Sequence, residues 1–184
     1  MTYPFLQAKY YTVGRGGRQV KQIFLHTAED QKLPGAAKRI WQWFFGKSAP
    51  KASAHLIVDA KDVEQSVKLT DTAWAVGDWY LNQTSISIEM CCAAKDWSTP
   101  WRKDAYLVEL LNNTAKVTAE LCFQFKIPPI KLTPAQLLLG RKGLAGHIDV
   151  TIAKKIRGGH TDPSLSFPWN DFVKLVQHHL ATIR

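Results

Sequence analysis

The 184-residue chain predicts an α/β fold in which a central mixed β-sheet is flanked by helices. Two observations support this expectation: short segments with alternating apolar and polar residues are interspersed with segments of helical periodicity, and a long amphipathic segment comes late in the chain. Such an order is typical of a sheet whose faces are covered by helices. A content of 46% hydrophobic and 21% charged residues argues against disorder. We therefore expect one domain over residues 1–184, with its core at about 20–175.

The strand candidates are short segments whose side chains alternate between two faces. The segment Gln22–His26 ends on His26, which faces away from Ile23 and lies just before a polar loop. Ser85–Met90 shows the clearest alternation and places Glu89 near the end of a central strand. A loop is expected at Tyr10–Arg18, and further strands at Ser53–Val58, Val63–Val67 and Ala73–Val76.

The helix candidates combine an apolar stripe with start signals. Thr99-Pro100 supplies a cap and a first-turn proline ahead of the longest helix, and Thr133-Pro134-Ala135-Gln136 gives a second start signal. The apolar periodicity predicts helices at Pro34–Phe45, at about Lys103–Phe125 and at Trp169–Thr182.

The charge balance favours an anionic partner but does not select one. Twenty-four Lys and Arg against 15 Asp and Glu give a net charge of +9, which attracts nucleic acid, anionic lipid or an anionic bacterial wall. The basic residues are scattered, and only Lys154, Lys155 and Arg157 approach a cluster. A solvated surface kept soluble by excess charge explains the same composition.

The three cysteines, Cys91, Cys92 and Cys122, form no disulfide framework and fit a chain made in a reducing compartment. The adjacent pair reads as small buried hydrophobes, with soft zinc ligands as the alternative. Residues 1–11 show no secretory signal, and no apolar run approaches the roughly 18 residues of a membrane span. We expect no stable membrane insertion.

A catalytic metal site is indicated by His26, His147 and the Gly158–Pro163 loop with its carboxylate at Asp162. A catalytic Zn²⁺ takes three protein ligands and keeps water in the fourth position. Because these residues are spread over most of the chain, only a folded domain can bring them together. His55 lies mid-strand on the polar face, where it either faces substrate, supports the site or is a hydrogen-bonded interior residue.

Six motifs follow one another along the chain: Ile23–Thr27, Ala52–Asp59, Ala73–Gly77, Asn82–Glu89, Gly146–Val150 and Gly159–Trp169. In this order they resemble the type 2 N-acetylmuramoyl-L-alanine amidases, whose fold is shared by peptidoglycan recognition proteins. The resemblance covers roughly residues 20–175, and its last motif resembles endolysins of phages that infect mycobacteria and their relatives.

The resemblance implies a Zn²⁺ held by His26, His147 and Asp162, with Glu89 as the general base. Many relatives place a lysine two residues before the third ligand, as the donor to the oxyanion, whereas this chain has His160 there. We expect His160 to donate that hydrogen bond. The competing assignment makes His160 the third ligand and puts Asp162 behind it, since zinc accepts either ligand type.

The implied activity is hydrolysis of the amide between N-acetylmuramic acid and L-alanine in bacterial peptidoglycan, as the catalytic part of a phage endolysin. Substrate would be held by Trp74, Trp79 and His55. A monomer is expected, kept in the host cytoplasm until lysis and then acting on the cell wall. The rival hypotheses are a non-catalytic muropeptide-binding module on the same fold and a nucleic-acid binder. The latter leaves the ordered motifs unexplained, so no nucleic-acid partner is expected.

Overall fold

The computed structural model describes residues 3–183, so Met1, Thr2 and Arg184 of the expected domain lie outside the described residues. Seven strands, six α-helices and two short 3₁₀ helices follow one another in this part of the chain. In chain order they are β1 (Tyr11–Thr12), β2 (Gln22–Thr27), α1 (Ala36–Phe45), β3 (Leu56–Val58), β4 (Val63–Gln65), β5 (Thr72–Ala73), α2 (Trp79–Gln83), β6 (Ser85–Met90), η1 (Ala94–Ser98), η2 (Trp101–Lys103), α3 (Ala105–Phe125), α4 (Pro134–Leu138), β7 (Gly143–Gly146), α5 (His147–Ala153) and α6 (Trp169–Thr182).

The main sheet has the strand order β4-β3-β6-β2-β7. Its four strands β3, β6, β2 and β7 run parallel, and β4 joins the edge antiparallel to β3. The short strands β1 and β5 form a separate antiparallel pair. The mixed central sheet expected from the sequence is confirmed.

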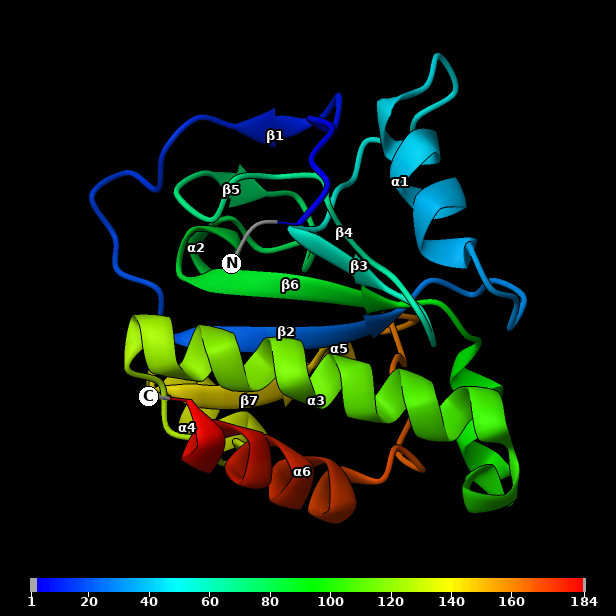
Figure 1. Ribbon diagram of the computed structural model, residues 1–184. Coiled ribbons are helices and arrows are strands. Elements are labelled where there is room, and N and C mark those ends of the chain that lie inside the picture. Colours follow the sequence, from blue (N-terminus) through cyan, green and yellow to red (C-terminus); the bar gives the residue numbers. More distant parts are fainter. Residues whose placement is uncertain (1–2, 184) are drawn as a thin grey trace.

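Helices cover both faces of this sheet (Figure 1). On one face the long helix α3 and the last helix α6 pack against alternate residues of the strands, among them Ile23 of β2 and Ile88 of β6. On the other face, Ile57 of β3 packs on α1, and Phe24 of β2 packs on residues of α2, α4 and α5. The alternation in β2 therefore sends Ile23 to one layer and its neighbour Phe24 to the other.

Most elements lie where the sequence places them, with shorter strands. α6 has the expected bounds Trp169–Thr182, and the capping box at Thr133 and Gln136 starts α4. The strand expected at Ser53–Val58 is reduced to β3 because only Leu56–Val58 pairs with β6. The loop expected at Tyr10–Arg18 contains the short strand β1, because Tyr11 and Thr12 pair with β5. The helices η1, η2, α2 and α5 and the strand β7 were not expected either.

The cap expected at Thr99-Pro100 for the longest helix is wrong. Those residues lead into η2, and α3 begins after Asp104, whose carboxylate accepts the N–H groups of Tyr106 and Leu107. An acidic residue is a better match to the positive end of a long helix than threonine five residues earlier, since the effect of a cap is confined to the first turn.

Cys91, Cys92 and Cys122 are buried and unbonded, as expected. Between residues 3 and 183, the helices are all too short or too polar to cross a membrane.

Candidate metal centre

The candidate ligands meet where parallel strands end. His26 is the fifth of six residues in β2, and His147 directly follows β7, which pairs with β2. The carboxyl ends of the strands in an open α/β sheet are the usual place for a binding site. The topology thus brings together two histidines that lie far apart in the sequence.

The start of α5 orients His147. Asp149 Oδ2 accepts the N–H of Gly146 at 2.7 Å, which ends β7 and begins the helix. Lys131 Nζ lies 2.8 Å from both carboxylate oxygens of Asp149 and 4.8 Å from the ring centre of Trp169. Sequence reasoning missed this pair, because it joins segments 18 residues apart.

The loop that carries Asp162 is tied to the same helix. Ile148 donates its N–H to the main-chain oxygen of Asp162 at 2.8 Å, and Thr151 Oγ1 donates to that of His160 at 2.8 Å. A Cβ at Gly159 would lie 2.7 Å from Thr151 Oγ1, so a side chain there would push the loop off α5.

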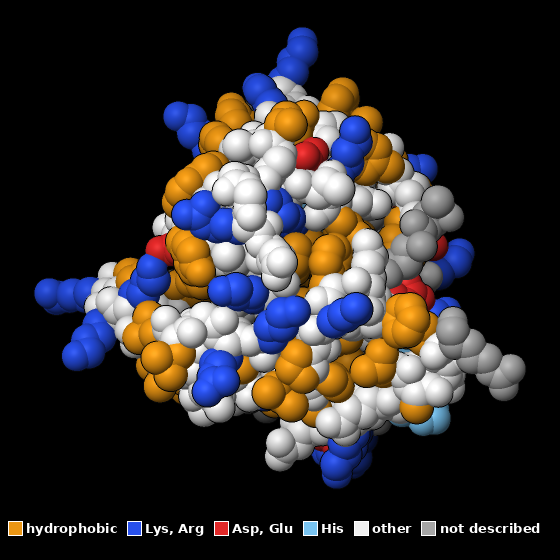
Figure 2. Space-filling view, turned by 90° about the vertical axis from the view of Figure 1, so that its left-hand side faces the viewer, with side chains coloured by type: hydrophobic (Ala, Val, Ile, Leu, Met, Phe, Trp, Pro, Cys, Tyr) orange, Lys and Arg blue, Asp and Glu red, His pale blue; other side chains and the backbone are white. Residues whose placement is uncertain are grey.

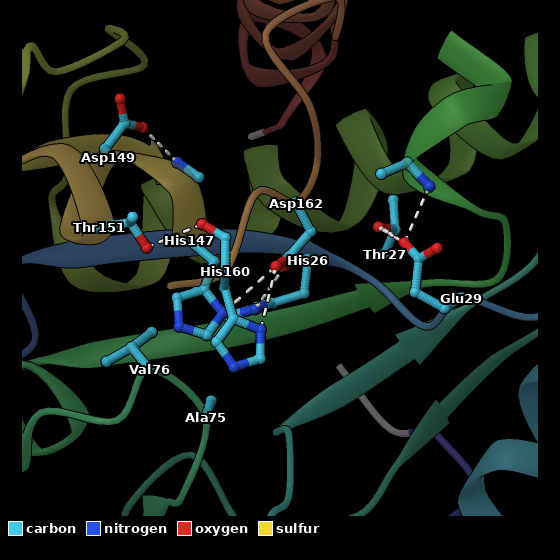
Figure 3. Close-up of polar contacts among 12 residues, drawn as sticks. His26, Thr27, Glu29, Ala75, Val76, His147, Asp149, Thr151, His160 and Asp162 are labelled. Atoms are coloured by element: carbon cyan, nitrogen blue, oxygen red, sulfur yellow. Dashed lines mark hydrogen bonds and ion pairs between the residues drawn. The ribbon is translucent and has the colours of Figure 1, made fainter. Parts of the chain in front are cut away.

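His26, His147 and Asp162 each offer a ligand atom, and these atoms lie within 4.8 Å of one another (Figure 3). The carboxylate of Asp162 lies 3.1 Å from Nδ1 of His26 and 3.5 Å from Nδ1 of His147. Two ligands about 2.1 Å from one tetrahedral Zn²⁺ are about 3.4 Å apart. All three residues are buried. Both the donor set and the spacing therefore fit Zn²⁺.

His160 lies at the solvent side of this cluster. Its ring stacks on that of His147 with centroids 4.0 Å apart, and its Nδ1 is 3.5 Å from the carboxylate of Asp162. The side chain is 71% exposed, against 11% for that of Asp162. The burial of Asp162 between two histidines favours it as the third ligand and leaves His160 facing the groove.

Burial and mutual contacts shift the pKa values of Asp162, His147 and His160. Burial pushes the pKa of Asp162 upward, but hydrogen bonds with His147 and His26 outweigh it and hold that pKa below its usual range. Burial lowers the pKa of His147, and burial together with the nearby His147 lowers that of His160. An ionised carboxylate beside neutral imidazoles is the protonation state in which these groups bind a metal ion.

Glu89 lies beside the cluster on β6, in register with His26. Its Oε2 is fully buried and has no hydrogen-bond partner among the described residues. Burial, with smaller contributions from Asp162 and Glu29, raises the pKa of Glu89 to about 8. A carboxylate with an uncommitted oxygen and a pKa near neutrality suits proton transfer.

Glu29 is a further residue that sequence reasoning missed. Its Oε1 accepts from Thr27 Oγ1 at 2.7 Å and from the N–H of Ala94 at 2.9 Å. These bonds fasten the segment after β2 to the segment after β6, next to His26 and Glu89. Nothing in the local sequence pattern signals this link.

A groove of about 490 Å³ opens onto the cluster and is lined by His147 and His160. Trp74 and Trp79, both expected to bind substrate, line it as well, and Trp79 is 53% exposed. Lys51 also lines the groove and was not expected from the sequence.

The expected substrate-binding role of His55 is wrong, because its side chain is fully buried. Its Nδ1 accepts the N–H of Ser87 at 3.1 Å, and its Nε2 lies 2.9 Å from Arg15 Nη2 and 3.2 Å from the Asp71 carbonyl oxygen. Burial and the Arg15 charge lower its pKa to about 3. Of the three roles left open for His55, the structure supports that of a hydrogen-bonded interior residue. Cys91 and Cys92, the alternative soft ligands, are not part of the metal cluster.

The comparisons with known proteins agree with this geometry. A family model described as N-acetylmuramoyl-L-alanine amidase matches residues 16–164. The fold is similar to that of the hydrolase AmiA from Staphylococcus aureus, solved in complex with its ligand (TM-score 0.67, 17% identity, covering 98% of this chain and 83% of that one). It is also similar to the PlyG catalytic domain (TM-score 0.61, 19% identity, 100% and 99% covered) and to a mutant endolysin from Bacillus subtilis (TM-score 0.60, 16% identity, 95% and 99% covered). No curated sequence matches the chain closely enough to add a relative.

Proposed function

This chain belongs to the N-acetylmuramoyl-L-alanine amidase family, and we propose that it is a zinc-dependent member that cleaves peptidoglycan during host lysis by a phage. The family membership makes it an enzyme that acts on peptidoglycan. The observation that supports zinc dependence is the buried His26, His147 and Asp162 cluster, with its ligand atoms within 4.8 Å of one another.

In this proposal His26, His147 and Asp162 hold Zn²⁺. A bound Zn²⁺ in such a site lowers the pKa of water to about 7 and polarises a substrate carbonyl. Asp162 adds a negative charge to the two imidazole ligands, and its burial keeps competing water away from the ligand atoms.

Glu89 is proposed as the general base and acid. Its free Oε2 accepts a proton from the water that attacks the lactyl–alanine carbonyl, and it returns the proton to the amine of L-alanine as the amide bond breaks. His160, exposed on the groove side of His147, donates a hydrogen bond to the tetrahedral oxyanion. Trp74 and Trp79 line the groove in which the muropeptide lies.

The role in phage lysis is supported by the resemblance of the Gly159–Trp169 motif to phage endolysins and by the fold of the Bacillus subtilis endolysin. We propose a monomeric domain over residues 1–184 that stays in the host cytoplasm until lysis. The net charge of +9 then favours its adsorption to an anionic wall.

The test measures zinc content and the release of new amino termini from purified peptidoglycan. Wild type, Glu89→Ala and the exposed control Glu109→Ala on α3 are compared. Stoichiometric zinc in all three, L-alanine termini from wild type and control, and near-silence from Glu89→Ala would support the proposal. Zinc without cleavage by wild type would favour a non-catalytic muropeptide-binding module, and absence of zinc would overturn the ligand assignment.

A further inference from the structure

A second hollow, with a volume of about 610 Å³, lies away from the catalytic groove. Val20, which lines it, comes just before β2, and Lys142 comes just before β7. The hollow is therefore at the amino-terminal edge of the sheet, whereas the metal cluster is at the carboxyl-terminal edge. Figure 2 shows this face, with hydrophobic side chains at the floor of a hollow and Lys and Arg side chains around it.

The hollow is strongly positive. Arg15, Arg18, Lys126 and Lys142 line it, and no Asp or Glu is among the described residues that do so. Four of the 24 Lys and Arg residues, which come from separate parts of the sequence, are thus brought together here by the fold.

Arg15 places a buried charge at the base of the hollow. It is 9% exposed, and its guanidinium donates to the main-chain oxygens of Leu69, Gln83 and Ser85 at 2.9–3.0 Å. These acceptors are neutral, and no carboxylate among residues 3–183 forms an ion pair with it. Its bonds hold it in place, so it contributes positive potential rather than a free donor.

The rim supplies further cations, of which Arg18 also lies over the ring of Tyr80, 5.2 Å from its centroid. Arg18 and Lys126 are exposed. Lys142 makes only long contacts of 3.3 and 3.4 Å with the main-chain oxygens that end α3. Val20, Leu69 and Phe125 give the same hollow an apolar wall. The size is in the range of small-molecule sites, which combine an apolar lining with a few polar anchors.

We propose that this hollow is a second, non-catalytic site for a phosphate ester with a small carbon skeleton, such as glycerol phosphate. Its phosphate oxygens contact Arg18, Lys126 and Lys142, and its carbon atoms lie on Val20, Leu69 and Phe125. Several convergent cations suit the spread charge of a phosphate. A hollow of this volume with an apolar wall suits one ester unit better than it suits duplex DNA, which needs an extended row of phosphate contacts.

Glycerol phosphate has two sources in a bacterial envelope, polyol-phosphate polymers of the wall and phospholipid headgroups. Binding to either would hold the enzyme near peptidoglycan through a contact separate from the glycan strand that is cleaved. This would raise the effective concentration of substrate at the catalytic groove.

The test measures binding of sn-glycerol 3-phosphate by calorimetry to the whole chain, at low and high salt. The double variant Arg18→Gln/Lys126→Gln is compared with Lys116→Gln/Lys174→Gln, which removes the same charge from exposed positions on α3 and α6 outside the hollow. Thermal unfolding of each variant confirms that it folds. We expect wild type and the control to bind alike, and the Arg18→Gln/Lys126→Gln protein to bind about tenfold more weakly or worse.

Two further binding experiments distinguish the two sources of glycerol phosphate, one with poly(glycerol phosphate) and one with phosphatidylglycerol vesicles. The site is supported if the Arg18→Gln/Lys126→Gln protein loses either interaction and the control double variant keeps it. Absence of binding by wild type, or equal loss in both double variants, overturns the proposal. Tighter binding of a DNA duplex to the same residues overturns it in favour of nucleic acid. Turnover of a small soluble muropeptide should be the same in all variants, so a failure of the proposed amidase chemistry is visible separately.

Discussion

His26 on β2 and Glu89 on β6 are register partners in a parallel ladder, so their side chains leave the same face of the sheet. The pairing of two central strands therefore sets the placement of a metal ligand relative to the general base. A loop would allow the two groups to drift, whereas adjacent paired strands hold them at a fixed separation.

Glu89→Gln is expected to stabilise the metal-free protein at pH 8 and to leave it nearly unchanged at pH 4. The pKa of Glu89 is raised to about 8 in the fold, against about 4.3 in an unfolded chain. The contribution of protonated Glu89 to the free energy of unfolding is thus fully present below the unfolded pKa, and it is lost as the pH rises through the folded pKa. We expect a gain on the order of 4–5 kcal/mol at pH 8, because each pKa unit corresponds to about 1.4 kcal/mol; urea unfolding in a chelator measures it.

The control for this experiment is Glu109→Gln, which changes an exposed carboxylate on α3. It should follow the wild-type pH dependence. A Glu89→Gln protein no more stable than wild type at pH 8 would show that Glu89 is ionised there without cost.

His160→Ala is expected to lower turnover about 100-fold while leaving zinc content unchanged, because it removes a donor to the oxyanion and no ligand. His160→Lys should retain most of the activity, since many relatives have lysine at this position. Metal analysis and steady-state kinetics on the same samples check both. Loss of zinc from the alanine variant would make His160 the third ligand, and full activity would remove it from the mechanism.

His55 is expected to make the protein acid-sensitive. Its pKa is about 3 in the fold and about 6.5 when unfolded, so the unfolded chain takes up a proton first as the pH falls below 6.5. This group lowers the free energy of unfolding by about 2 kcal/mol between pH 7 and pH 5. Urea unfolding should show that loss in wild type and in the exposed control His178→Asn, and a smaller loss in His55→Asn. If the free energy of unfolding falls equally with pH in all three proteins, His55 is not the source of the acid sensitivity.

Lys51→Gln is expected to reduce the preference for stem peptides that carry a free carboxylate over their amidated forms. Lys51 lines the catalytic groove and is exposed, so its pairing with a carboxylate contributes about two- to fivefold in kcat/KM. Competition between the two forms of one muropeptide measures the ratio. Lys47→Gln, an exposed neighbour that does not line the groove, should keep the wild-type ratio; an unchanged ratio for Lys51→Gln would exclude this contact.

The parts of the site that the sequence predicts are those with a local signal. Alternation in Gln22–His26 and Ser85–Met90 predicts the face of each strand to which His26 and Glu89 belong, and the ladder then brings the two residues onto one face of the sheet. The strand Gly143–Gly146 has no such signal, because two of its four residues are glycines and it is a strand only by pairing with β2. His147 consequently begins a helix that the sequence pattern does not reveal.

The error at His55 has a different cause. Alternation separates two faces of a strand but does not say which face meets solvent. Here helices cover both faces, so the polar face at His55 is interior and is satisfied by Arg15 and Ser87 rather than by a substrate. The link from Lys131 to Asp149 depends on segments 18 residues apart meeting in the fold, which composition and spacing do not predict.

The hydrogen bonds that join Ile148 to Asp162 and Thr151 to His160 are made by the protein alone. These bonds hold the two ligand-bearing segments together without help from a ligand, so we expect metal loading to order no loop. The metal site is therefore preorganised, and little conformational entropy is lost when the ion binds. We expect the rate of metal uptake to be set by dehydration of the ion and by its passage through the groove. Chelation and reloading should be repeatable without refolding the enzyme.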